Sequence, residues 1–236
     1  MPSLTIEKKD HTGEDAEQVK RVRLDCKATV NMGAFSRGGP TRGAHKAREH
    51  DLGGKAKSIP GGIVDEDTAQ RSVTFGSACK TSDVIVATLA AWWQGRSATA
   101  HDESERVQIP MDNGSESRGV RTPLLHRMVQ CADTIGKPLH LLSDPPYHRQ
   151  DKPLARCWGM MEWHGNGAQR SAVETMLEGA KRMTWKGLKP VVALRRKVYT
   201  KGVSLSTVAR RAVEARWERH PLLPKWDILI HPVGAD

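Results

Sequence analysis

Two aspartates, Asp25 and Asp112, stand where a carboxylate could do chemistry. Asp25 lies inside residues 21–31, whose alternating pattern predicts a strand, and a carboxylate in a strand costs desolvation unless it is paired or binds a cation. Asp112 directly follows a short apolar run at 107–111. An acid at the mouth of a strand is where an α/β protein places a catalytic or metal-binding group. Both could instead be ordinary strand-end carboxylates on a solvated face.

The stretch 143–163 would present the start of a helix to these acids. Pro145 and Pro146 form a turn that cannot be helical, whereas Pro153 suits a first helical turn because proline has a fixed φ and no amide donor. The apolar residues that follow at helical spacing are Leu154, Cys157, Trp158 and Met161. This spacing predicts a helix with one buried face.

The elements around these residues predict a mixed sheet. Strands are expected at 21–31, 59–64, 71–77, 105–111 and 139–142, and helices at 81–95, 118–135, from Pro153 onward, and at 171–184, 190–200 and 204–219. Pro110 is a flaw in the fourth strand, because a central strand needs that amide. The order is that of the ribonuclease H-like fold: a five-stranded mixed sheet flanked by helices, with a helical C-terminal extension. We expect a disordered lead-in at 1–20, a catalytic domain at 21–170 and a basic extension packed on it at 171–236.

This order would bring Asp25, Asp112 and a third group at the helix start together. Two-metal phosphoryl transfer needs such a set, because carboxylates must hold two divalent cations about 3.5–4 Å apart. Mg²⁺ suits these sites because it prefers hard oxygen ligands.

A formal charge of +10 over 236 residues favours a polyanionic partner. The expected contacts to a DNA backbone come from a glycine-rich loop at 33–57 and from the last helices; they are Arg37, Arg42, Lys46, Arg195, Arg196, Lys197, Arg210 and Arg211. His148 is a further candidate, or a turn-capping or solvated histidine. Backbone contacts predict binding that weakens steeply with salt and has little sequence preference. The alternative is a basic protein whose charges are only solvated.

The cysteines and the apolar runs bear on location. Four cysteines lie far apart without a C-x-x-C pair, which is typical of reduced thiols in the cytoplasm. The longest apolar run, 84–93, is half of what a membrane span needs, and the first twenty residues are charged. We expect no membrane segment, no export and a cytoplasmic, nucleoid-associated protein.

Short motifs follow one another in a specific order and spacing: LDCKATVNMGAFSRGG, EHDLG, IPGGI, TSDVIVATLAAWWQ, MDNGSES, DPPYH, KPLARCWG, MTWKG and LPKW. In this order they resemble the DDE transposases of bacterial insertion sequences, specifically the ISAzo group, over about residues 20–230. The resemblance implies cleavage of double-stranded DNA at transposon ends and joining of the freed 3′ hydroxyl to target DNA, with Mg²⁺ or Mn²⁺. It also implies a homo-oligomer, because two ends are paired. Asp25 and Asp112 fall on the first and second catalytic acids.

The third acid of the family, a glutamate in an N-P-I-E motif, is replaced here by Ala155. Loss of a carboxylate from a two-metal site should cost several kcal/mol of transition-state stabilisation. Asp151 is one helical turn earlier and is the better substitute. Glu162 is about 10 Å further along the helix axis, too far without a register change. The replacement is either natural or engineered.

Three functions therefore stay open. The first is an insertion-sequence transposase, active or impaired, and the second is an inactive DNA-binding remnant. The third is a ribonuclease H-like nuclease outside transposition, such as a resolvase, which would share the metal site but not the DPPYH and TWKG motifs. Transposases of this kind usually carry an N-terminal helix-turn-helix region, and about twenty residues precede the first strand here. A catalytic-domain fragment with poor terminal-repeat specificity is expected.

Overall fold

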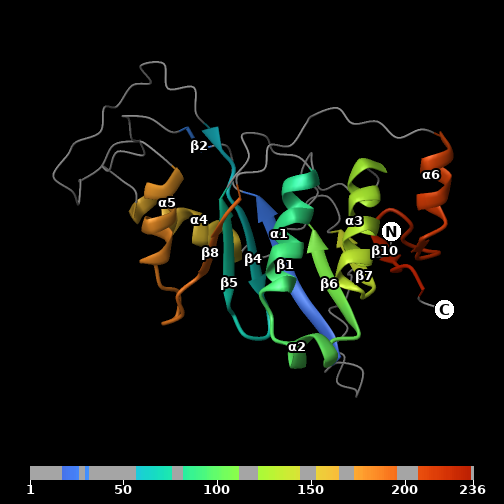
Figure 1. The fold of residues 1–236 in the computed structure, drawn as a ribbon, viewed down its shortest axis with the longest axis horizontal. Helices are drawn as coiled ribbons and strands as arrows, with labels where there is room; N and C mark the ends of the chain where they lie inside the picture. The colour runs from blue at the N-terminus through green and yellow to red at the C-terminus, as the bar shows by residue number, and fades with distance from the viewer. Residues whose placement is uncertain are drawn as a thin grey trace, which may run out of the picture.

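The computed structural model describes residues 18–26, 30–31, 57–75, 82–111, 122–143, 153–164, 173–195 and 207–234. Within these residues, eight strands form one mixed sheet in the order β8-β5-β4-β1-β6-β7-β10-β9 (Figure 1). The strands are β1 (Val19–Cys26), β4 (Gly61–Asp65), β5 (Arg71–Phe75), β6 (Arg106–Met111), β7 (Leu139–Ser143), β8 (Val191–Leu194), β9 (Trp217–Arg219) and β10 (Asp227–Ile230). A separate short pair joins β2 (Val30–Asn31) to β3 (Lys57–Ser58).

The helices among the described residues are α1 (Ser82–Gln94), α2 (Ala98–Asp102), α3 (Thr122–Ile135), α4 (Pro153–His164), α5 (Val173–Lys181) and α6 (Thr207–Glu214). In the part of the chain that the structure covers, no helix has the length and apolar character needed to cross a membrane.

The five central strands, β5-β4-β1-β6-β7, confirm the predicted fold class. β1 pairs antiparallel with β4, and β4 pairs antiparallel with β5. On its other side β1 runs parallel to β6, and β6 runs parallel to β7. This is a ribonuclease H-like arrangement, an α/β sheet in which an antiparallel half meets a parallel half at β1.

The predicted number of strands was wrong, because three further strands from the C-terminal region extend the sheet at both edges. A helix was expected over 190–200, but residues Val191–Leu194 form β8, paired parallel with β5. The helix expected over 204–219 ends at Glu214 and is followed by β9, which pairs with the unpredicted β10. The C-terminal extension is therefore not purely helical. The apolar residues of a strand as short as β8 can match helical spacing by chance. Pairing with the open edge of β5 makes this segment a strand.

Helices cover the two faces of the sheet, and each face has its own core. α1 and α3 lie in front of the sheet in Figure 1, whereas α4 is partly hidden behind β8. Ile63 belongs to the core under α1 and α3, while its neighbour Val64 and Val73 of β5 belong to the core under α4 and α5. This alternation follows from the two-residue period of a strand. The buried face of α4, Leu154, Cys157, Trp158 and Met161, confirms the predicted helical pattern.

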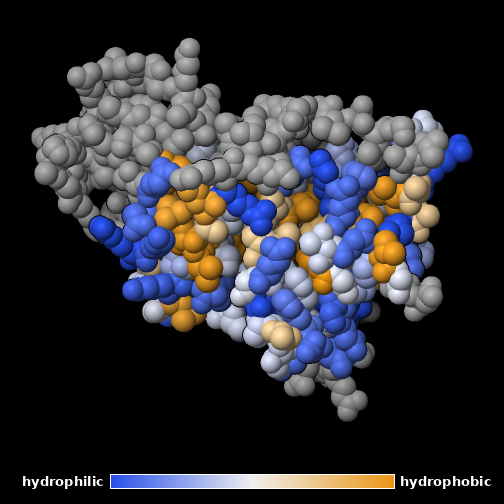
Figure 2. Space-filling view, in the orientation of Figure 1, coloured by the Kyte–Doolittle hydropathy of each residue, from blue (hydrophilic) through white to orange (hydrophobic). Residues whose placement is uncertain are grey.

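The strand β8 lies at one edge of the sheet and is less buried than the central strands. Val191 is 59% exposed, and the other three residues of β8 are only half-buried. Figure 2 accordingly shows apolar surface in the region of α5 and β8. The core therefore thins toward this edge of the sheet.

Pro110 is accommodated in β6 because of where pairing with β1 stops. The β1–β6 register covers only Arg106 to Gln108 on β6. The amide of Val107 donates to the Pro138 oxygen, on the β7 side, at 3.0 Å. Since successive residues of a strand point their amides to opposite sides, the missing amide of Pro110 would face β1 beyond the end of that register. The proline therefore removes no ladder bond.

Three of the four cysteines are described, and all three are buried free thiols: Cys26, Cys131 and Cys157. Burial raises the pKa of Cys131 to about 12. Burial also raises the pKa of Cys157, against the opposing charge of Arg71. These two thiols are therefore protonated and inert at neutral pH. Cys79 lies outside the described residues.

Candidate active site

Asp25 lies at the carboxyl end of β1, where the antiparallel and parallel halves of the sheet meet. Its partner across the β1–β4 pair is Gly62. β6, the parallel neighbour of β1, ends at Met111, which directly precedes Asp112 in the sequence. Because parallel strands end at the same edge of a sheet, the carboxyl ends of β1 and β6 face the same side. Asp112 itself lies outside the described residues.

The end of β1 is paired on one side only. Its register with β6 stops at Arg21 and Gln108, whereas its register with β4 continues to Cys26. Asp25 therefore sits past the last hydrogen-bonded pair between the two central parallel strands. Such a point, where the sheet changes direction, is where α/β proteins bind their ligands.

α4 packs against this end of β1 and contacts Asp25 directly. The indole Nε1 of Trp158 donates a hydrogen bond to Oδ2 of Asp25 at 3.1 Å. Trp158 is 6% exposed, which confirms that it is a packed core residue rather than a base-stacking surface. The indole thus connects the two segments that the sequence suggested would meet.

Gly62 makes room for α4 at this point. A Cβ at Gly62 would lie 2.8 Å from Leu154 Cδ2 and 2.8 Å from Trp158 Cζ2. These distances are shorter than real carbon contacts, so with any side chain here Leu154 and Trp158 would have to shift. The residue opposite Asp25 therefore has to be a glycine for the indole to reach the carboxylate.

Ala155, where the motif resemblance places the third acid, is exposed on α4. It lies three residues before Trp158, and residues at this spacing are neighbours on a helix surface, with Cβ atoms about 5–6 Å apart. A longer acidic side chain at position 155 would therefore start one turn from the residue that contacts Asp25. Asp151 lies outside the described residues, as does the side chain of Glu162.

The donor groups present can be compared with what two divalent cations need. Asp25 offers hard oxygen atoms of the kind that Mg²⁺ prefers, but the methyl group of Ala155 has no donor atom. Among the described residues, no three His, Cys, Asp or Glu side chains come together in a way that could hold a metal ion. The described groups therefore do not fit a two-metal site whose third ligand is at position 155.

The candidate DNA contacts are spread over the molecule. Arg195 follows β8 and is half-buried, and its amide donates to the Phe75 oxygen at 2.8 Å. Arg210 and Arg211 are exposed on α6. α6 and β8 lie at opposite ends of the sheet (Figure 1), so these arginines do not form one surface. The others lie outside the described residues: Arg37, Arg42, Lys46, His148, Arg196 and Lys197.

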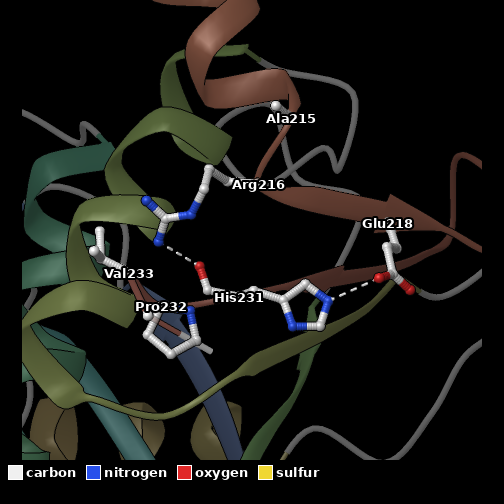
Figure 3. Close-up of a pocket in the computed structure, with 7 residues that line it drawn as sticks. Ala215, Arg216, Glu218, His231, Pro232 and Val233 are labelled. Atoms are coloured by element: carbon white, nitrogen blue, oxygen red, sulfur yellow. Dashed lines mark hydrogen bonds and ion pairs between the residues drawn. The ribbon is translucent and has the colours of Figure 1, made fainter. Parts of the chain in front are cut away.

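A pocket of about 550 Å³ lies beside β9 and β10 rather than at Asp25 (Figure 3). Arg216 there donates to the His231 oxygen at 2.6 Å and pairs with Asp133 of α3 at 2.6 Å. His231 Nε2 lies 3.1 Å from Glu218 Oε1. Through these contacts the residues around the pocket join the C-terminal strands to α3.

Two residues were not identified from the sequence as part of the candidate site. They are Gly62 and Trp158, whose indole N–H contacts Asp25. A glycine inside a buried strand, together with a tryptophan on a helix expected to face that strand, was the available signal. This signal does not identify the two residues without the β1–β4 register, which places Gly62 opposite Asp25.

The strand order and the placement of Asp25 against α4 define an α/β domain of the ribonuclease H-like class. Residues 4–232 match the family model described as the Rhodopirellula transposase DDE domain, and the chain belongs to this family. The match confirms the DDE transposase of insertion-sequence type that the motifs indicate. No curated protein and no solved structure matched the chain.

Proposed function

We propose that this chain is the DNA-cleaving and strand-joining domain of an insertion-sequence transposase, in which the loss of the third acid at Ala155 weakens the catalytic step. The observation that carries the proposal is the hydrogen bond from Trp158 to Asp25. It holds α4 against the carboxyl end of β1, so that position 155 lies one turn from the residue that contacts the first acid. Family membership supports DNA as the substrate.

In this proposal Asp25 and Asp112 are the remaining acids. The Trp158 indole orients one oxygen of Asp25 and, being buried, keeps water from that side of the carboxylate. Mg²⁺ or Mn²⁺ is the expected cofactor by family likeness, and Asp25 and Asp112 are the residues that would hold it. With only two carboxylates, metal affinity and cleavage should both be reduced by orders of magnitude.

The partner in this proposal is double-stranded DNA, as transposon ends and as target, bound mainly through its backbone. Arg210 and Arg211 are exposed and have no acidic partner among the described residues, so they support this assignment. Pairing of two ends implies a homo-oligomer during the reaction.

A second candidate, an inactive DNA-binding remnant, is favoured by Ala155 itself. It differs from the first only in whether the two remaining acids still support cleavage. Restoring the missing carboxylate separates the two candidates.

The test compares Ala155→Glu with the parent chain by calorimetric titration of Mn²⁺ and by nicking of supercoiled plasmid. Gly159→Glu is the control, because it adds the same charge one turn further along the same face of α4, where no atom lies near the missing Cβ. Ala155→Glu should raise Mn²⁺ affinity at least about 10-fold, and the control should not. Asp25→Asn or Asp112→Asn should abolish the gain.

The outcomes separate the candidates. Weak metal-dependent nicking by the parent that rises in Ala155→Glu supports an impaired transposase. Nicking in Ala155→Glu alone makes the chain a remnant. Equal effects of Ala155→Glu and Gly159→Glu would show that the gain comes from added negative charge on this face of α4 and not from a ligand at position 155.

A further inference from the structure

The turn between α5 and β8 carries the MTWKG motif, which the catalytic site does not use. Trp185 and Leu188 exchange two backbone hydrogen bonds, at 2.9 Å and 3.0 Å, across a two-residue tip. The tip residues, Lys186 and Gly187, have φ of 50° and 79°. Two successive positive φ angles define a type I′ turn. Glycine adopts this conformation easily, but lysine does so uncommonly, so the backbone holds Lys186 at the tip of a tight hairpin.

The turn is fixed to β5 through two contacts. The guanidinium of Arg71 lies over the Trp185 ring, 4.5 Å from its centroid, and Arg71 is 5% exposed. The Gln70 side chain donates to the Lys189 oxygen at 2.8 Å. A cation stacked on an aromatic face and a side-chain hydrogen bond from the adjoining residue hold the turn from both ends. Its cations are therefore presented by a rigid support.

The surface of this turn has an excess of positive charge. Residues 178–189 contain four cations, Lys181, Arg182, Lys186 and Lys189, against one carboxylate, Glu178. Lys181 pairs with Glu178 at 2.8 Å. Arg182, Lys186 and Lys189 are exposed and make no ion pair with any described residue. Figure 2 shows hydrophilic side chains next to apolar ones around the end of α5 and the turn that follows.

The neighbouring acidic residues do not neutralise these cations. They lie in the turn between β4 and β5 and are paired with their own partners: Asp65 with Lys20 and Arg96, Asp67 with Lys20, and Glu66 with Arg23. The excess charge near Lys186 and Lys189 is therefore available to an external anion.

This surface lies at the opposite end of the sheet from Asp25. The strand registers through β4 and β5 place Asp25 level with Val192 of β8. Lys186 precedes Val192 on the chain, and at about 3.3 Å per extended residue the turn lies at most about 20 Å from that level. β8 is also three strands away from β1, at about 4.8 Å per strand. DNA bound at the turn would therefore contact the chain at a place separate from Asp25.

We propose that the Trp185–Leu188 turn, with Arg182 and Lys189, is a second DNA-contact surface that binds the phosphate backbone of duplex DNA. Fixed, exposed cations without base-reading geometry suit phosphates, which carry no sequence information. The proposal rests on the proposed function in assuming that the chain binds DNA. It adds where a second DNA segment is held and which residues hold it.

The test measures the binding of a labelled random-sequence duplex by anisotropy over a series of NaCl concentrations. The triple variant Arg182→Gln, Lys186→Asn, Lys189→Gln removes the three cations, and asparagine at 186 keeps the turn because it tolerates positive φ. The slope of log K against log salt should become shallower by about 0.9 for each phosphate that is no longer neutralised, or roughly 2–3 in total. Lys181→Gln is the matched control, since Lys181 already pairs with Glu178, and should change the slope by less than about 0.9.

Two results would overturn the inference, and they differ from a failure of the proposed function. A folded triple variant with the slope of the parent would show that the turn does not bind DNA. If the triple variant bound DNA like the parent but no longer bound anionic lipid vesicles that the parent binds, the surface would be assigned to a membrane instead. A parent chain that binds no duplex even at low salt would remove the proposed DNA function as well.

Discussion

Asp25 and Asp65 lie on paired strands of one sheet, at opposite ends, and their surroundings differ in kind. Asp65 is 1% exposed, and its two oxygens lie 2.8 Å from Lys20 Nζ and 2.8 Å from Arg96 Nη1. The backbone amides of Asp67 and Thr68 also donate to it. Asp25 instead accepts a hydrogen bond from the neutral Trp158 indole at the edge of the sheet. The cations around Asp65 neutralise its charge, whereas the indole orients one oxygen of Asp25.

The charges around Asp65 also set its titration. Burial raises the pKa of Asp65, but the hydrogen bonds from Lys20 and Thr68 and the charges of Lys20 and Arg96 together bring it below its ordinary value. Asp65 is therefore ionised in the folded protein and belongs to its framework. A buried acid surrounded by cations thus serves the fold.

Among the variants that test this comparison, Asp65→Asn is expected to lower the free energy of unfolding the most. It leaves Arg96 without its counter-charge and Lys20 with only the more exposed Asp67, which should cost about 3–5 kcal/mol of the free energy of unfolding. Asp67→Asn is the control, because the Asp67 side chain is 48% exposed and its pair with Lys20 should contribute less than about 1 kcal/mol. Urea unfolding measures both, and equal losses would show that Asp65 is not the centre of the network.

A smaller effect is expected at the other end of the sheet from Gly62→Ala. The added methyl group would clash with Leu154 and Trp158, which should cost about 1–3 kcal/mol and move the indole away from Asp25. Gly159→Ala on α4 is the matched change, since no atom lies near its missing Cβ. It should stabilise the helix by about 0.5–1 kcal/mol. Urea unfolding and Trp fluorescence report the two results, and destabilisation by both variants would refute the packing argument.

The smallest expected effect is on the pH dependence of stability. Because the pKa of Asp65 is lower in the folded state than its ordinary value of 3.8, its stabilising contribution is complete above that value. The contribution should be lost as pH falls through the lower folded-state pKa. The stability difference between the parent and Asp65→Asn should therefore narrow as the pH is lowered from about 6 to about 3, at about 1.4 kcal/mol for each unit of pKa difference. Unfolding curves that keep a constant difference would contradict this assignment.

Much of the fold could be predicted from local patterns. The five central strands, α1, α3 and α4 follow from periodicity and from the proline at the start of α4. β8, β9 and β10 were missed because strands of three or four residues contain too few positions to distinguish the two periods. These three segments are strands because they pair with neighbouring strands of the sheet: β8 with β5, β10 with β7, and β9 with β10.

For the candidate site, the sequence by itself provided a carboxylate inside the first predicted strand, an alanine where the resemblance places the third acid, and a helix that starts at Pro153. These features can be recognised from residues that are close together in the sequence, so local spacing is sufficient to find them. Only the tertiary structure decided that Trp158 meets Asp25, a residue 133 positions away, and that Gly62 gives the indole its place. Contacts between distant segments depend on strand register and close packing, and no local periodicity contains that information.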